Sequence, residues 1–164
     1  MPAASGDTPT IHATAVLAGA RAVLIRGPAG SGKSSLALRL IQAADAGLLP
    51  FARLVGDDRV RLWAAHGRLL VRPAAALAGL LEVRGLGIVR MRFESIAVVA
   101  AVIDLGDEAT DRLPEPDRRT VRLEGIWLPR LAVAPGADPV GPMLVFLQEV
   151  QGSPVAAGGP ICVG

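Results

Sequence analysis

The chain has 164 residues, a length that fits one domain with a buried hydrophobic core. Hydrophobic residues make up 51% of the composition and charged residues 20%, which excludes an intrinsically disordered chain. The net charge is only +2, from 17 basic and 15 acidic residues, so bulk electrostatic attraction gives no support to nucleic-acid binding.

Three features of the sequence bear on where the protein works. Cys162 is the only cysteine, so no disulfide can form within the chain, which suits a reducing compartment. The N-terminal stretch MPAASGDTPT has neither the basic segment nor the apolar run of a secretory signal. No apolar run approaches the ~18 residues that a membrane-spanning helix needs. We therefore expect a cytoplasmic protein that does not enter a membrane.

The first part of the chain predicts two strands, a glycine-rich loop and a helix. After a flexible tail at residues 1–10, apolar runs at Ala13–Leu17 and Ala22–Ile25 predict two strands joined by a tight turn. Leucines at helical spacing among good helix formers then predict a helix over Ser34–Ala44, which ends before Gly47.

The middle of the chain is mostly strand-like. Phe51–Val55 predicts a short strand, and Val60–Trp63 and Leu69–Val71 predict the two arms of a hairpin. The small apolar residues of Pro73–Leu80 predict a short helix. Ile96–Leu105 is apolar almost throughout, which is typical of a strand buried on both faces.

The last third of the chain begins with a polar segment, Asp107–Arg119, that predicts an exposed loop. A strand over Ile126–Val133 and a final helix over Pro139–Val150 follow. Residues 151–164 are rich in glycine and proline and predict a flexible tail, which leaves residues 11–150 as the folded domain.

The segment GPAGSGKS at residues 27–34 fits the phosphate-binding loop G-x-x-x-x-G-K-[ST], between a predicted strand and a predicted helix as that motif requires. Its glycines let backbone N–H groups turn around phosphate oxygens, and the helix N-terminus adds a favourable dipole. In this motif the lysine, Lys33, reaches the β- and γ-phosphates and the serine, Ser34, binds Mg²⁺. We predict a nucleotide site formed by Gly27, Gly30, Ser31, Gly32, Lys33, Ser34 and Ser35.

Asp57 and Asp58 follow the predicted strand Phe51–Val55 and are candidates to work with this loop. Phosphoryl transfer needs a carboxylate near the metal and a group that positions or deprotonates the nucleophile. An acidic pair at a strand end can supply both. A plain polar turn is the alternative that these two residues alone leave open.

Four more residues are candidates with weaker signals. His12 is isolated, and a lone histidine is more often structural than functional. Glu82 and Arg84 flank one residue, so on a strand they would face the same side, as a salt bridge or as a metal ligand and a phosphate contact. Arg112 lies in the polar loop, where an arginine is ordinarily solvated surface.

Together these residues resemble the catalytic domain of HPr kinase/phosphorylase, over roughly residues 11–150. The family has a histidine near the start of the domain, here His12, and then the GKS loop. Two further stretches follow in the family's order, DDRV at residues 57–60 and LEVRGLGI at residues 81–88, and in this order they are far more specific than the phosphate loop alone. Later family segments are matched by DRL at residues 111–113 and PRL at residues 129–131.

The resemblance implies an α/β fold with a P-loop and a mixed β-sheet, similar to the nucleotide-binding core of phosphoenolpyruvate carboxykinase. It implies phosphorylation, with ATP and Mg²⁺, of a serine of HPr, the carrier protein of the bacterial phosphotransferase system. The reverse reaction removes that phosphoryl group with inorganic phosphate and releases pyrophosphate. Family members are typically hexamers, and short forms consisting of the kinase domain alone occur, so we expect a homo-oligomer of the short form.

Carried over residue by residue, the resemblance makes Asp57 the base that accepts the serine proton and the acid of the reverse direction. His12 lies beside Asp57, Lys33 binds the β-phosphate region, and Arg112 lies near the transferred group, where positive charge stabilises transfer. Arg84 contacts phosphate. The predicted metal ligands are Ser34, Asp58 and Glu82.

Two other functions remain open at this point. A small-molecule P-loop kinase would use Asp107–Arg119 as a lid, but it leaves the LEVRGLGI stretch unexplained. A sensor that binds nucleotide without transferring phosphate is the second. A GTPase switch is excluded, because the chain has no asparagine and therefore no guanine-reading N-K-x-D motif.

Overall fold

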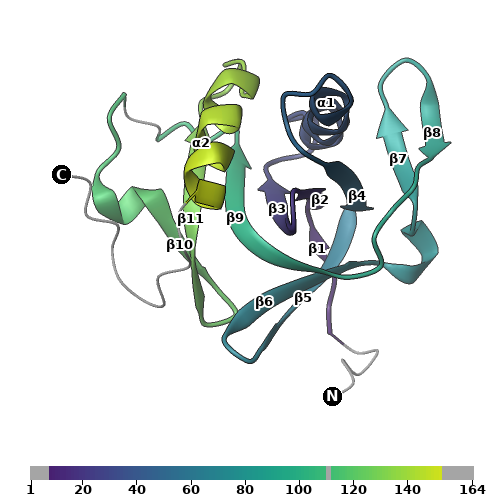
Figure 1. The fold of residues 1–164 in the computed structure, drawn as a ribbon, viewed down its shortest axis with the longest axis horizontal. Helices are drawn as coiled ribbons and strands as arrows, with labels where there is room; N and C mark the ends of the chain where they lie inside the picture. Colours follow the sequence, from purple (N-terminus) through teal and green to yellow (C-terminus); the bar gives the residue numbers. More distant parts are fainter. Residues whose placement is uncertain (1–7, 110–111, 153–164) are drawn as a thin grey trace.

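The computed structural model describes residues 8–109 and 112–152 as a mixed α/β fold (Figure 1). At its centre β3 (Arg21–Arg26) lies parallel to β9 (Ala97–Leu105), which lies parallel to β11 (Ile126–Val133). The other pairings among the described strands are antiparallel. The predicted mixed sheet is therefore confirmed.

The sheet extends to both sides of the β3–β9 pair. On the β3 side it continues through β2 (Thr14–Ala18) to β4 (Ala52–Gly56). On the other side, β9 pairs with β6 (Arg68–Pro73) along its first residues and with β11 along its last. Beyond β6 come β5 (Arg59–Ala65) and the two-residue β1 (Ile11–His12). On this side β9 therefore has two neighbours in succession, β6 along its first residues and β11 along its last.

Both helices cover the same face of the sheet. α1 (Lys33–Asp45) and α2 (Val140–Gly152) lie side by side above the strands in Figure 1. One hydrophobic cluster joins their inward residues, such as Leu40 and Met143, to strand residues such as Ile25. Full burial of such a side chain contributes about 1.5–3 kcal/mol, so this cluster fixes α1, and with it the phosphate loop, on the sheet.

The opposite face is covered by the β5–β6 hairpin, which crosses below the central strands in Figure 1. A second hydrophobic cluster joins Leu24 of β3 to Val60 and Leu69 of this hairpin. Successive residues of β3 therefore enter different clusters, since Val23 points to the helices and Leu24 to the hairpin. Burial on both faces explains why this strand is apolar without alternation.

A separate two-stranded hairpin stands beside α1, at the right of Figure 1. Its strands are β7 (Leu80–Val83) and β8 (Gly87–Arg90), and they contain most of the LEVRGLGI stretch. Leu81 is fully buried in the first cluster. This contact brings the hairpin close to the phosphate loop at the start of α1.

The predicted helix over Pro73–Leu80 is wrong. Pro73 is the last residue of β6, and Leu80 is the first of β7. Between them is a single 3₁₀ turn, Ala75–Leu77, and Gly79 then adopts a φ of +74°, in which a helix does not continue. A run of small apolar residues does not distinguish a helix from a tight crossing between two strands.

Three smaller differences concern the C-terminal half. β10 (Thr120–Leu123) was not predicted and forms a hairpin with β11. The loop over Asp107–Arg119 is largely exposed as predicted and ends in a 3₁₀ turn, Pro116–Arg119. α2 runs through Gly152, two residues into the predicted tail. The rest of that tail, 153–164, and residues 1–7 lie outside the described residues.

Candidate active site

The phosphate loop connects β3 to α1, as the motif requires. Gly27 is needed for space, because a Cβ there would lie 2.5 Å from Ser31 Oγ and 2.8 Å from the Leu105 carbonyl oxygen. Gly32, directly before α1, is needed for its backbone, which has a φ of +98°. The Ser31 hydroxyl is buried and has no hydrogen-bond partner among the described residues. An unpartnered buried hydroxyl of this kind calls for a partner such as a water molecule or a ligand atom.

Lys33 folds back over the loop that precedes it. Its ammonium donates hydrogen bonds to the carbonyl oxygens of Gly27 (2.9 Å) and Pro28 (3.1 Å), and only 6% of the residue is exposed. Burial lowers the pKa of Lys33 below its ordinary value, while the negative charges of Asp57 and Asp58 act in the opposite direction. The loop therefore holds a desolvated cation beside two carboxylates.

Asp57 lies directly after β4 and is 4% exposed. Its carboxylate accepts hydrogen bonds from the Ser34 hydroxyl at 2.8 and 2.9 Å and from the Glu82 backbone N–H at 3.1 Å. It also accepts one from the hydroxyl of Thr14 on β2, at 2.7 Å. One buried carboxylate thus joins the phosphate loop, the central sheet and the LEVRGLGI hairpin.

Asp58 and His12 form a second, more exposed pair next to Asp57. Asp58 has a φ of +66°, and its Oδ1 lies 3.1 Å from His12 Nε2. The strand pairing of β1 with the start of β5 brings the two residues together, because His12 is opposite Arg59. The side chains are 38% and 63% exposed, so this pair faces solvent while Asp57 does not.

The other predicted site residues lie at the surface. Glu82 and Arg84 are exposed on the hairpin, and among the described residues neither side chain makes a hydrogen bond or ion pair. The salt bridge considered from the sequence is therefore absent from this part of the chain. Arg112 is exposed in the polar loop, and within residues 8–109 and 112–152 no hydrogen bond or ion pair joins it to the site. Its place near a transferred group stays a prediction.

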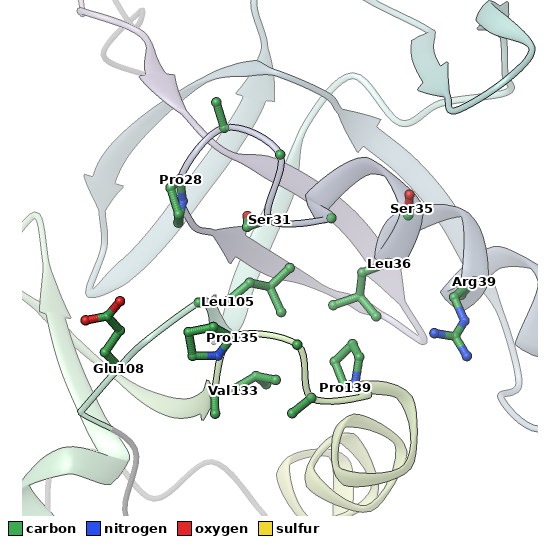
Figure 2. A pocket seen from close by; sticks show the side chains of 17 residues that line it. Pro28, Ser31, Ser35, Leu36, Arg39, Leu105, Glu108, Val133, Pro135 and Pro139 are labelled. Carbon is green, nitrogen blue, oxygen red and sulfur yellow. The ribbon is translucent and has the colours of Figure 1, made fainter.

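A cavity of about 560 Å³ opens on the other side of the phosphate loop (Figure 2). Its walls are the loop itself, one side of α1 and the residues that follow β9 and β11. Leu36, Val133 and Pro139 give it apolar surfaces, and Arg39 and Glu108 stand at its edges. Ser35, predicted to bind nucleotide, is exposed and lines this cavity rather than the side that faces Asp57.

An ion-pair network that the sequence did not indicate lies where the three parallel strands end. Asp104 of β9 accepts hydrogen bonds from Arg26 Nε and Nη2 at 2.7 and 2.8 Å, and another from Arg130 of β11. Arg130 also donates to Asp107. Burial works against ionisation of Asp104, but the hydrogen bonds from both arginines outweigh it and hold the pKa of Asp104 below its ordinary value. The sequence signal that could have indicated this network was Asp104 itself, an aspartate inside a strand predicted to be buried.

Thr14 is another residue near the candidate site that the sequence analysis did not identify. It is fully buried on β2 and bonds to Asp57 across 43 residues of sequence. A threonine in an apolar strand is ordinary, so no local signal distinguishes it.

The described residues contain no group of three or more His, Cys, Asp or Glu residues arranged to hold a metal ion. Nor, in these residues, is any helix both long and apolar enough to cross a bilayer.

Comparison with known proteins gives consistent matches. Residues 6–102 match the family model described as the HPr Serine kinase C-terminal domain. The HPr kinase/phosphorylase of Streptococcus thermophilus is 33% identical over 138 residues, which cover 76% of this chain and 41% of that protein. That of Clostridium tetani is 37% identical over 83 residues, which cover 51% and 24%. The chain therefore spans less than half the length of these curated relatives.

Among solved structures, the HPr(Ser) kinase/phosphatase from Coxiella burnetii superimposes with a TM-score of 0.66 at 25% sequence identity. The superposition covers 87% of each chain, so it includes nearly all of the fold described above. The predicted α/β class, with a phosphate loop in a mixed sheet, is confirmed by this likeness.

Proposed function

This chain belongs to the family of the HPr serine kinase C-terminal domain, and from that premise we propose that it is an ATP-dependent protein serine kinase. Its proposed acceptor is HPr, the phosphocarrier of the bacterial phosphotransferase system. The observation that carries the proposal is the buried Asp57 carboxylate, hydrogen-bonded to Ser34 of the phosphate loop. This contact supports the proposal that Asp57 is a proton acceptor close to the terminal phosphates of a nucleotide bound to the loop.

The proposed reaction transfers the γ-phosphoryl group of ATP to a serine hydroxyl. The serine oxygen forms a bond to the γ-phosphorus, the bond from that phosphorus to the β–γ bridging oxygen breaks, and ADP leaves. Asp57 takes the serine proton. In the reverse direction, inorganic phosphate attacks the phosphoserine phosphorus, Asp57 returns the proton to the serine oxygen, and pyrophosphate is released.

The cations of the site would stabilise the charge that spreads over the transferred group. Lys33, already desolvated and directed at the loop, is proposed to turn from the Gly27 and Pro28 carbonyls to the β-phosphate region. Arg84 and Arg112 are proposed to contact phosphate oxygens from the hairpin and the polar loop. The buried Ser31 hydroxyl gains a partner when phosphate fills the loop.

The oxygen donors around Asp57 fit Mg²⁺, which is usually bound through one or two carboxylates together with substrate phosphates and water. Ser34, Asp58 and Glu82 are the proposed ligands. When bound, the ion would neutralise phosphate charge and align the β- and γ-phosphates.

The cavity on the far side of the loop is the proposed site of the nucleoside. Its volume of about 560 Å³ falls in the range of small-molecule sites, and its walls combine apolar surface with a few polar side chains. We further propose that the protein works in the cytoplasm. We also propose that it assembles as a homo-oligomer, and the molar mass from light scattering on purified protein would test this assembly.

The proposal is tested by incubating the protein with ATP, Mg²⁺ and HPr from the same organism and measuring the intact mass of HPr. One added phosphoryl group, mapped to a serine, is expected. Lys33→Ala and Asp57→Asn are expected to abolish the transfer, while Asp45→Asn, an exposed control at the end of α1, retains it. Added inorganic phosphate should then release pyrophosphate from phosphorylated HPr.

Two results would contradict the proposal. Tight ATP binding without transfer to HPr would favour a small-molecule kinase or a nucleotide sensor. Transfer that survives Asp57→Asn would remove the proposed role of this carboxylate.

A further inference from the structure

Asp57 is held by three donors that belong to three different parts of the molecule. The Ser34 hydroxyl belongs to the phosphate loop, and the Glu82 N–H belongs to the β7–β8 hairpin. The Thr14 hydroxyl belongs to the central sheet and donates to Oδ1 at 2.7 Å, the shortest of these contacts. The three donors therefore differ in which part of the fold fixes their position.

Thr14 is the most rigidly placed of the three. It is fully buried, and the next residue, Ala15, pairs with Gly56 in the β2–β4 ladder, which puts Thr14 directly across from Asp57. A register shift follows immediately, between Ala15 and Val16, so this contact lies at an irregularity of the ladder. Threonine is branched at Cβ and therefore stiff at χ1, which restricts the directions in which its Oγ1 can point.

Ser34, in contrast, has a second proposed task as a ligand of Mg²⁺, and its single proton is shared between both oxygens of Asp57. The hairpin that carries Glu82 is a separate two-stranded sheet. Of the three donors, only Thr14 is both fully buried and part of the main sheet.

We propose that Thr14 is a positioning residue for phosphoryl transfer, whose buried hydroxyl holds Asp57 in the orientation that receives the acceptor serine's proton. This inference rests on the proposed kinase function. It assigns Thr14 no contact with ATP or with the acceptor. Its effect is therefore expected in the transfer step and not in nucleotide affinity.

The test compares Thr14→Val, which keeps the shape and removes the hydroxyl, with Thr14→Ser, which keeps the hydroxyl. Thr120→Val on β10 is the matched control at a distant, partly buried threonine. In Thr14→Val we expect kcat for HPr phosphorylation to fall about tenfold to a hundredfold, the equivalent of one hydrogen bond to a charged group. The KM for ATP is expected to stay within about twofold.

Thr14→Ser is expected to restore kcat to within about threefold of the unsubstituted protein. A loss of folded protein alone would also lower the apparent kcat without changing the KM for ATP, so kcat is expressed per folded, nucleotide-binding molecule. The proposal is overturned if Thr14→Val keeps its kcat, if Thr14→Ser is equally impaired, or if the KM for ATP rises in step.

A second readout does not depend on activity. Crystal structures of the unsubstituted protein and Thr14→Val, grown under one condition, would show whether the Asp57 carboxylate turns when the hydroxyl is removed. A turned carboxylate is expected, and an unmoved one overturns the inference. If the unsubstituted protein fails to phosphorylate HPr, the proposed function fails, and the crystal structures still decide whether Thr14 orients Asp57.

Discussion

Asp104→Asn removes the charge that holds two arginines at the ends of the three parallel strands, and we expect it to destabilise the fold. The Asp104 side chain is 13% exposed, and those of Arg130 and Arg26 are 17% and 30% exposed. Removing one partner of a buried ion pair costs about 3–5 kcal/mol, and the partial exposure of Arg26 reduces this to about 2–4 kcal/mol. For a chain of this length, the middle of this range of free energies corresponds to a fall in Tm of about 6–12 °C.

Urea denaturation at pH 7, followed by circular dichroism, measures this free energy of unfolding. Asp138→Asn is the matched control, because its ion pair with Arg39 is at the surface, with side chains 69% and 48% exposed. We expect the control to change the free energy of unfolding by less than about 1 kcal/mol. Equal effects of the two substitutions would refute the reasoning from burial.

The effect of Asp104→Asn should also depend on pH. The folded-state pKa of Asp104 lies below its unfolded value of 3.8, so the ionised carboxylate stabilises the fold fully above that pH. This contribution is lost as the pH falls through the folded-state pKa. The difference between the two proteins should therefore be constant above about pH 5 and shrink below pH 3.8. A difference that does not shrink as the pH falls below 3.8 would mean that packing, and not charge, is responsible.

Three further predictions follow from the site and the core. Gly27→Ala places a Cβ 2.5 Å from Ser31 Oγ and should weaken ATP binding at least about tenfold in a fluorescent-nucleotide titration; unchanged affinity would show that the loop can relax. Leu40→Ala should cost about 2–5 kcal/mol in urea denaturation because Leu40 is fully buried, whereas Val145→Ala, 58% exposed, should cost far less. Glu82→Gln should raise the Mg²⁺ concentration that gives half-maximal phosphorylation, measured by Mg²⁺ titration, and an unchanged requirement would remove Glu82 from the proposed ligands.

Most of the secondary structure could be predicted because its signals are local. The leucines of α1 recur at helical spacing, and the apolar runs around residues 22–25 and 97–105 are continuous because those strands are buried on both faces. The elements that were predicted wrongly or missed are those whose local sequence is ambiguous. Small apolar residues over Pro73–Leu80 suit a helix and a strand crossing equally, and β10 is a strand of only four residues whose pairing with β11 decides its conformation.

The residues of the candidate site likewise differ in whether their local sequence marks them. The phosphate loop could be predicted because eight consecutive residues form it, and Asp57 and Glu82 became candidates through the stretches around them; their roles stay predictions. Thr14 was not, because 43 residues separate it from Asp57 and nothing in its own neighbourhood marks it.

The phosphate loop, the class of fold and the family could therefore be predicted from the amino-acid sequence alone, since each depends on neighbouring residues or on short stretches in a given order. The folded chain was needed to see which carboxylate is buried, which donors hold it, and that Arg26 and Asp104, 78 residues apart, pair where their parallel strands end. Strand pairing brings together residues that are distant along the chain. Their burial and hydrogen bonds depend on that register and on no local pattern.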